Sequence, residues 1–189
     1  MKKLLFLLII TVSLPLVAQK FSSESIPQVD GQVQFRVELK TQLDKATAHE
    51  RIVDFVKNKK LQFYSVRFTA DNEDTTVCRV IDYVEISNQP LQIFAMYMTY
   101  TLFFEYSDNL CIVTFSSIKF MEMENFEERE RAQELRKPMP ERVEYSANYI
   151  MIDKHYREAF IRNASQKVSD AAINRINGIV KQLEKEFLR

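Results

Sequence analysis

LQIFAMYMTYTLFFEYSDNLCIVTFSSIKFM, residues 91–121, is the segment whose pattern most clearly indicates the architecture. It contains two runs rich in Val, Ile, Thr, Tyr and Phe, which favour the pleated, half-buried surface of a sheet. Between the runs lies the turn-prone tripeptide SDN, residues 107–109, which is too short for a helical crossover. We therefore predict strands over Leu91–Tyr106 and Leu110–Met123, paired as an antiparallel hairpin.

Three more strands are predicted upstream of this hairpin. Leu61–Thr69 and Thr75–Ser87 have the same composition, and the turn-prone segments DNEDT and SNQP bound them. Further upstream, apolar residues alternate with polar ones, which is the pattern of a strand with one wet face; the apolar ones are Val33, Phe35, Val37 and Leu39. The connections between the four later strands are hairpin-short, so the sheet is expected to be antiparallel.

Two segments have the period of an amphipathic helix. One begins near Asp44, with Asp44 or Thr47 as its cap, and its apolar positions are Ala48, Ile52, Phe55 and Val56. The other runs close to the C-terminus, with Ser165 as its cap, and its apolar positions are Val168, Ala172, Ile176, Ile179, Val180, Leu183 and Phe187. The order β-α-β-β-β-β-α predicts an α+β fold: a five-stranded antiparallel sheet covered on one face by two helices.

A charged segment separates the last strand from the final helix. Residues 124–144 are dominated by Glu and Arg and end in Pro138 and Pro140, so we expect a solvated helical turn or two and then a break. Glu141–Ile152 is expected to form a short helix. Residues 19–189 are thus predicted to be a single domain, with a charged insertion or connection over residues 123–165.

The first 18 residues have the pattern of a secretory signal peptide. Lys2 and Lys3 precede an apolar run from Leu4, and Pro15 comes shortly before Ala18, after which we expect cleavage. The run is shorter than the ~20 residues that span a bilayer, so we expect no membrane span in the mature chain. Because no cysteine follows the cut, a lipid anchor is not expected, and the protein is predicted to be periplasmic or secreted.

Composition excludes several functions. Removal of residues 1–18 leaves 24 basic and 26 acidic residues, a net charge of −2, without the clustered basic face of a nucleic-acid binder. Gly31 and Gly178 are the two glycines of the sequence. Because phosphate-cradling loops need several closely spaced glycines, P-loop and dinucleotide sites are excluded, and no cofactor is expected.

Three further segments are IPQVDGQVQFRVELK at residues 26–40, ERIVDFVKNK at residues 50–59 and KHYREAFI at residues 154–161. Together they resemble an exported bacterial family of unknown function that has a TATA-binding-protein-like (TBP-like) fold. The resemblance covers most of the mature chain and is one of pattern. It implies a fold and a compartment, and it brings no catalytic residues.

Few residues suggest chemistry. His49 and His155 are the two histidines, far apart in sequence, and both are expected on the solvated surface. Five acids could attract Ca²⁺, but interleaved arginines and the missing calcium-loop spacing favour a solvated helix; they are Glu122, Glu124, Glu127, Glu128 and Glu130. We therefore assign no catalytic, cofactor-binding or metal-binding residues.

The hairpin strand Leu91–Tyr106 has two unlike faces. Its even positions from Phe94 to Tyr106 are large and apolar, and they should be core. Its odd positions are less polar than a solvent face requires, which either reflects strand formers tolerating exposure or indicates a partner-contact face; the candidates are Tyr97, Thr99, Thr101 and Phe103.

These patterns favour a non-enzymatic binding or interaction module of the envelope or the secreted fraction. Its partner would be a protein, a glycan or an apolar ligand, held by the open sheet face. One alternative is a small hydrolase or metal-dependent enzyme, with a site built from scattered acids and His155. A second alternative is a carrier that holds an apolar ligand between sheet and helices.

Cys78 and Cys111 are predicted to be unpaired. A turn at Asn88 and Gln89 would place Cys78 opposite about Thr99, and the next turn would place Cys111 opposite about Tyr106. The thiols would then lie two strands apart, about seven residues apart along the sheet and on opposite faces, far beyond the ~7 Å between Cα atoms that a disulfide allows.

Overall fold

The computed structural model describes residues 21–58, 61–89, 92–159 and 161–187. The predicted signal peptide and its cleavage site after Ala18 lie outside the described residues. Within the described residues, no helix has the length and apolar character to cross a membrane.

One antiparallel sheet forms the centre of the fold. Its main strands lie in the order β3-β7-β6-β5-β4, and the short strand β8 (Tyr145–Ser146) adds to β7. The main strands are β3 (Phe35–Lys40), β4 (Ser65–Asp71), β5 (Thr75–Gln89), β6 (Gln92–Ser107) and β7 (Leu110–Glu122). The five predicted strands are thus present, with β8 as an addition.

A separate hairpin precedes the sheet. Strands β1 (Gln28–Val29) and β2 (Gln32–Val33) pair with each other. Asp30 and Gly31 form the turn with φ angles of 49° and 73°, a left-handed geometry that Asp-Gly pairs accept readily.

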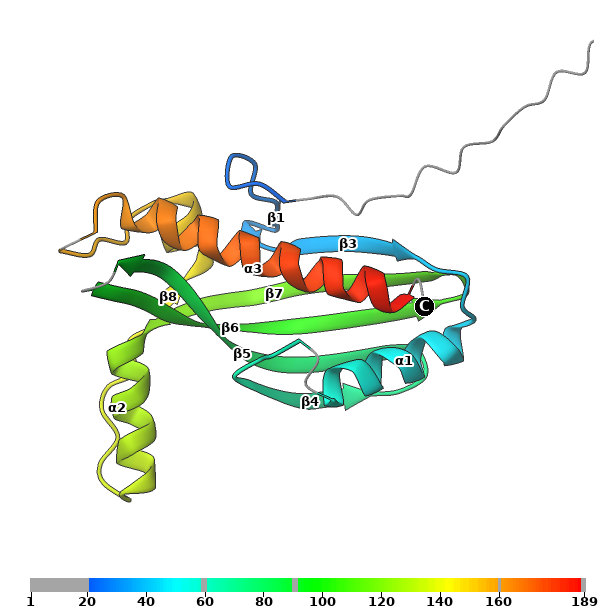
Figure 1. Ribbon diagram of the computed structural model, residues 1–189, viewed down its shortest axis with the longest axis horizontal. Coiled ribbons are helices and arrows are strands. Elements are labelled where there is room, and N and C mark those ends of the chain that lie inside the picture. Colours follow the sequence, from blue (N-terminus) through cyan, green and yellow to red (C-terminus); the bar gives the residue numbers. More distant parts are fainter. Residues whose placement is uncertain (1–20, 59–60, 90–91, 160, 188–189) are drawn as a thin grey trace, which may run out of the picture.

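Two helices cover one face of the sheet, as Figure 1 shows. They are α1 (Lys45–Lys57) and α3 (Ala164–Phe187), and their apolar stripes pack on side chains of the strands. Every even position of β6 from Met96 to Tyr106 is buried in this layer. The predicted two-layer α+β architecture is confirmed.

The helix starts differ in part from the predictions. Asp44 caps α1, because its carboxylate accepts the backbone N–H of Thr47 at 2.9 Å. Ser165 does not cap α3, which begins one residue earlier. Its buried hydroxyl instead donates to the carbonyl of Tyr156 at 3.0 Å and ties the helix to the preceding loop.

A bulge divides β7 into two halves that bury opposite parities. Thr99 pairs with Lys119, whereas Thr101 pairs with Ser116, so β7 holds one extra residue here. Ser117 has a φ of 53° at this point, the left-handed geometry common in bulges. Phe115 is therefore buried before the bulge, and Phe120 is buried after it.

The charged connection contains a helix, as predicted, and then a short strand and a helical turn in the segment where one short helix is predicted. Helix α2 spans Met123–Glu134 and projects away from the body (Figure 1). The predicted helix over residues 141–152 is wrong for its first half, because residues 145–146 pair with β7. Its second half is a single π-helical turn, η1 (Asn148–Ile152).

Cys78 and Cys111 are free and buried. The predicted register of Cys78 is wrong, because it lies opposite Leu102, and Cys111 lies opposite Tyr106 as predicted. The β5–β6 turn comes later than expected, so both thiols share the helix-covered face, four residues apart along it. That offset still separates them by ~13 Å at the strand rise. Burial raises the pKa of each thiol to about 12.

Candidate functional site: the second face of the sheet

The face of the sheet opposite α1 and α3 is the candidate site, and we call it the second face. Of the four residues predicted there, Thr99, Thr101 and Phe103 lie on it and are half-buried. Their even-numbered neighbours point into the helix layer. Alternation along β6 therefore places these three side chains as the sequence predicts.

An apolar strip runs across the middle of the second face. Val77 on β5 lies directly opposite Phe103 on β6, and Ile112 on β7 is diagonal to Phe103. Ile81 lies on the same face of β5, opposite Thr99, but Arg79 separates it from Val77 and from the strip. All four apolar side chains are half-buried, and none belongs to the core between sheet and helices.

Tyr97, the fourth predicted residue, lies on the same side of β6 but is covered by α2. Phe126 of α2 stacks on its ring with centroids 3.8 Å apart. Tyr64 and Tyr83 contact Tyr97 edge-on, at 5.0 and 5.6 Å. Only 6% of Tyr97 is exposed, so in this structure it anchors α2 and does not belong to the uncovered part of the face.

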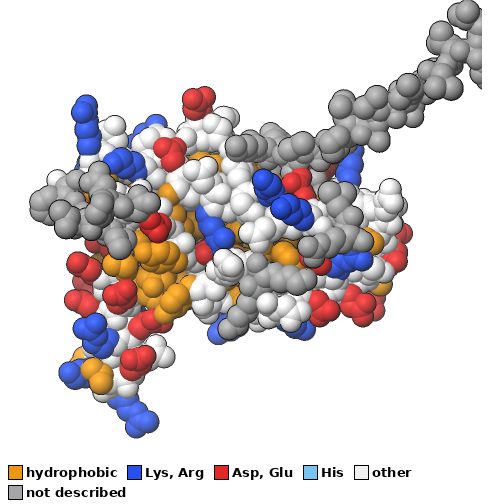
Figure 2. Space-filling model, viewed as in Figure 1, with side chains coloured by type: hydrophobic (Ala, Val, Ile, Leu, Met, Phe, Trp, Pro, Cys, Tyr) orange, Lys and Arg blue, Asp and Glu red, His pale blue; other side chains and the backbone are white. Residues whose placement is uncertain are grey.

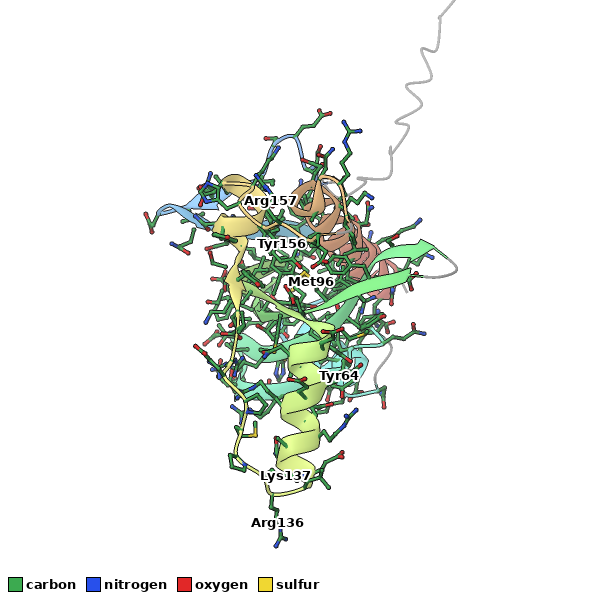
Figure 3. The ribbon with its side chains drawn as sticks, turned by 90° about the vertical axis from the view of Figure 1, so that its left-hand side faces the viewer. Tyr64, Met96, Arg136, Lys137, Tyr156 and Arg157 are labelled. Atoms are coloured by element: carbon green, nitrogen blue, oxygen red, sulfur yellow. The ribbon has the colours of Figure 1, made fainter. Side chains whose placement is uncertain are left out.

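Tyr64 and Tyr83 remain 47% and 38% exposed around this anchor. Figure 2 shows apolar side chains gathered where α2 meets the body, and Figure 3 shows Tyr64 beside the helix. The Tyr64 hydroxyl donates to the carboxylate of Glu130, which raises the pKa of Tyr64 to about 12. The aromatic cluster thus borders the second face and fixes the direction in which α2 projects.

The contribution of Phe126 was missed because it lies among charged residues, in NFEERER at residues 125–131. A single aromatic in such a run gives no apolar stripe along a helix, so the sequence predicts a helix that is solvated on all sides. The sequence signal for this contact is Tyr97 itself, because a large aromatic side chain on the outer face of β6 favours a covering apolar residue such as Phe126.

Charged side chains surround the apolar strip. Arg36 and Glu38 of β3 form an exposed ion pair of 3.3 Å. Arg67 of β4 and Arg79 of β5 are exposed on the opposite side of the strip and lie directly opposite each other. An apolar centre with a charged border is the usual arrangement of a protein interface.

The two histidines lie far from this face and from each other. His155 is exposed, and its ring lies edge-on to Tyr149 at 5.5 Å. His49 is half-buried, contrary to the expectation of a solvated side chain, because α1 places its Nε2 at 2.8 Å from Asp71 Oδ1 on β4. The structure therefore does not bring the histidines together.

The five predicted acids are spread over β7 and α2. Glu122 accepts hydrogen bonds from the hydroxyls of Tyr145 and Tyr156, at 3.2 and 3.0 Å. Glu124, Glu127, Glu128 and Glu130 follow along α2. Among the described residues, no group of three or more His, Cys, Asp or Glu side chains is arranged to hold a metal ion.

A buried ion pair, which no sequence pattern predicts, lies between the helix layer and the sheet. Asp82 on β5 is 1% exposed, and Arg175 of α3 donates to its Oδ2 from Nε at 2.7 Å. Tyr100 donates to the same oxygen at 3.3 Å. Arg175 also donates to the carbonyl of Leu61 at 2.6 Å, so the pair joins α3 to the sheet and to the segment before β4.

Comparisons with known proteins place the fold. No family model matches the chain, and no curated protein matches it. A DUF4468 family protein from Bacteroides ovatus ATCC 8483 is similar in structure, with a TM-score of 0.66 at 15% identity, over 86% of this chain and 90% of that one. A TBP-like protein from Parabacteroides distasonis ATCC 8503 gives a TM-score of 0.63 at 10% identity, over 87% and 97%.

These likenesses show the fold. The chain has the TBP-like fold that the resemblance implied, and its structural neighbours include a bacterial protein of a domain-of-unknown-function family.

Proposed function

We propose that this protein is an exported, non-enzymatic interaction module that binds a protein partner through the second face. The observation that carries the proposal is the apolar strip of Val77, Phe103 and Ile112, with Ile81 on the far side of Arg79. These half-buried side chains are outside the core, and α1 and α3 pack on the other face. Contiguous apolar surface of this kind, bordered by charge, commonly marks a contact with another protein.

The shape of the face favours a protein over a small molecule. Small-ligand sites are concave pockets that enclose most of the ligand, whereas the strip lies on the outer surface of a sheet. A hollow in the described part of the chain lies away from the second face, between the N-terminal segment and α3. It is lined by Phe21, Ser22, Ser23, Asp170, Ile173 and Asn174.

The two alternatives have less support. A carrier needs space between sheet and helices, but large side chains of both layers are fully buried there, among them Phe104, Phe115 and Ile52. An enzyme built around His155 needs acidic side chains close to the imidazole. Within the described residues, the ring contact of His155 is with Tyr149.

Site-specific photocross-linking tests the proposal. A photoreactive phenylalanine analogue placed at Phe103 should give a discrete adduct of higher mass in the bacterium that produces the protein. The matched control carries the same analogue at Lys181, an exposed position of α3 on the other side of the molecule. No adduct from Phe103, or the same adducts from both positions, would contradict the proposal.

A further inference from the structure

A polar row crosses the second face beside the apolar strip. Arg67, Arg79, Thr101 and Ser116 are successive cross-strand partners on β4, β5, β6 and β7. Four adjacent strands extend over ~14 Å. The row therefore presents two guanidinium groups at one end and two hydroxyls at the other, on one continuous surface.

The two arginines are placed unfavourably for the isolated protein. Directly opposite side chains in an antiparallel pair have Cβ atoms only ~5 Å apart, and like charges there destabilise the sheet. Both residues are exposed, and neither guanidinium forms an ion pair or hydrogen bond with another described residue. Elsewhere on the same face, Arg36 is paired with Glu38 and Lys119 with Glu144.

We infer that this row recognises carboxylates on an acidic surface of the protein partner. This inference rests on the proposed function and specifies the chemistry of the partner. Guanidinium groups bind carboxylates through two parallel hydrogen bonds, and a carboxylate between Arg67 and Arg79 would cancel their repulsion. Thr101 and Ser116 then offer hydroxyl donors to further acceptors, while the apolar strip beside them supplies the buried area.

The test repeats the Phe103 cross-link with both arginines replaced. In the Arg67→Ser/Arg79→Ser variant the adduct should fall about tenfold or more, and in the wild type it should weaken as salt is raised. Arg162→Ser is the control, because Arg162 is an exposed arginine in the turn just before α3 and its replacement changes the charge in the same sense. This control should keep the wild-type adduct.

Thermal unfolding provides an independent readout. Because the replaced charges repel each other, the double variant should unfold at the same temperature as the wild type or at a higher one. A lower unfolding temperature would show that the arginines hold the sheet together, and it would overturn the inference.

The other outcomes separate the two proposals. A full adduct in the double variant would overturn acidic recognition and leave the protein-binding proposal standing. No adduct in the wild type would overturn both. Retention of the purified wild type on a heparin column at about 0.15 M salt, lost in the double variant and with no protein adduct in cells, would assign the row to a sulfated polysaccharide and overturn the inference.

Discussion

At the scale of the residue, Asp82 and Arg175 hold the helix layer on the sheet. Burial raises the pKa of the Asp82 carboxyl, and the hydrogen bond from Arg175 opposes that effect. Ion pairs of this kind add little net stability, yet removal of one partner is costly because the other charge stays buried.

We predict that Arg175→Met lowers the free energy of unfolding by about 2–4 kcal/mol at neutral pH. Without Arg175, the pKa of Asp82 rises further above its ordinary value of 3.8. A carboxyl with a raised pKa in the folded state gives stability that is complete below its unfolded pKa and is lost as pH rises through the folded one. The cost of the substitution should therefore be small near pH 3.5 and grow toward pH 7.

Urea unfolding at several pH values measures this effect. Adding Asp82→Asn to Arg175→Met should recover part of the loss at neutral pH, and Arg162→Met, at an exposed site, should change stability by less than about 0.5 kcal/mol. A cost that stays constant with pH would contradict the assigned role of the Asp82 carboxylate.

Single residues could be predicted where one rule decides their placement. Alternation along β6 correctly separated the core residues, such as Met98 and Leu102, from Thr99 and Thr101. Alternation could not place Asp82 of β5, since a charged residue in a strand is expected on the wet face unless a distant arginine pairs with it. It also could not show that Tyr97 is covered, because Phe126 reaches it from another element.

At the scale of the element, α2 is a projecting helix fastened at its base and along one side. The base is the stack of Phe126 on Tyr97. Along the side, Asn125 donates to the carbonyl of Glu141 at 3.0 Å and accepts from the N–H of Val143 at 3.2 Å. The returning chain is thereby held against the helix, and Figure 3 shows Arg136 and Lys137 at its far end.

We predict that Phe126→Ala releases the base of α2. The half-buried ring should contribute about 1–3 kcal/mol to docking of this helix, a loss confined to α2 because Phe126 lies outside the main core. Trypsin should then cleave after Arg129 or Arg131 several times faster than in the wild type, with the thermal midpoint nearly unchanged. The control is Leu135→Ala, at a position 56% exposed at the end of the helix. Equal cleavage rates in both variants would mean that Phe126 does not fasten α2.

Elements with a strong local pattern were predicted, and elements that depend on distant partners were not. The predicted strand Leu110–Met123 matches β7 to within one residue. In contrast, β8 forms because Tyr145 and Ser146 pair with Phe120 and Lys119 of that strand. No local pattern in residues 141–152 announces such a pairing, so a short helix was predicted there instead.

In the molecule as a whole, helices α1 and α3 cover one face of the sheet, and the apolar strip lies on the second face. The helices α1 and α3 fill one side of the sheet with a closely packed core. On the other side, the apolar strip lies between the Arg36–Glu38 ion pair and the two opposed arginines. Both features are in keeping with a scaffold whose second face is completed by another protein.

Hydroxyl-radical footprinting of the protein in intact cells and after purification shows whether a partner covers the second face. If a partner covers the second face, oxidation of Phe103 should be several times slower in cells than in the purified protein. Oxidation of Tyr149, which is 38% exposed on the distant turn η1, should be the same in both. Equal oxidation of Phe103 in cells and in the purified protein would contradict a covered second face.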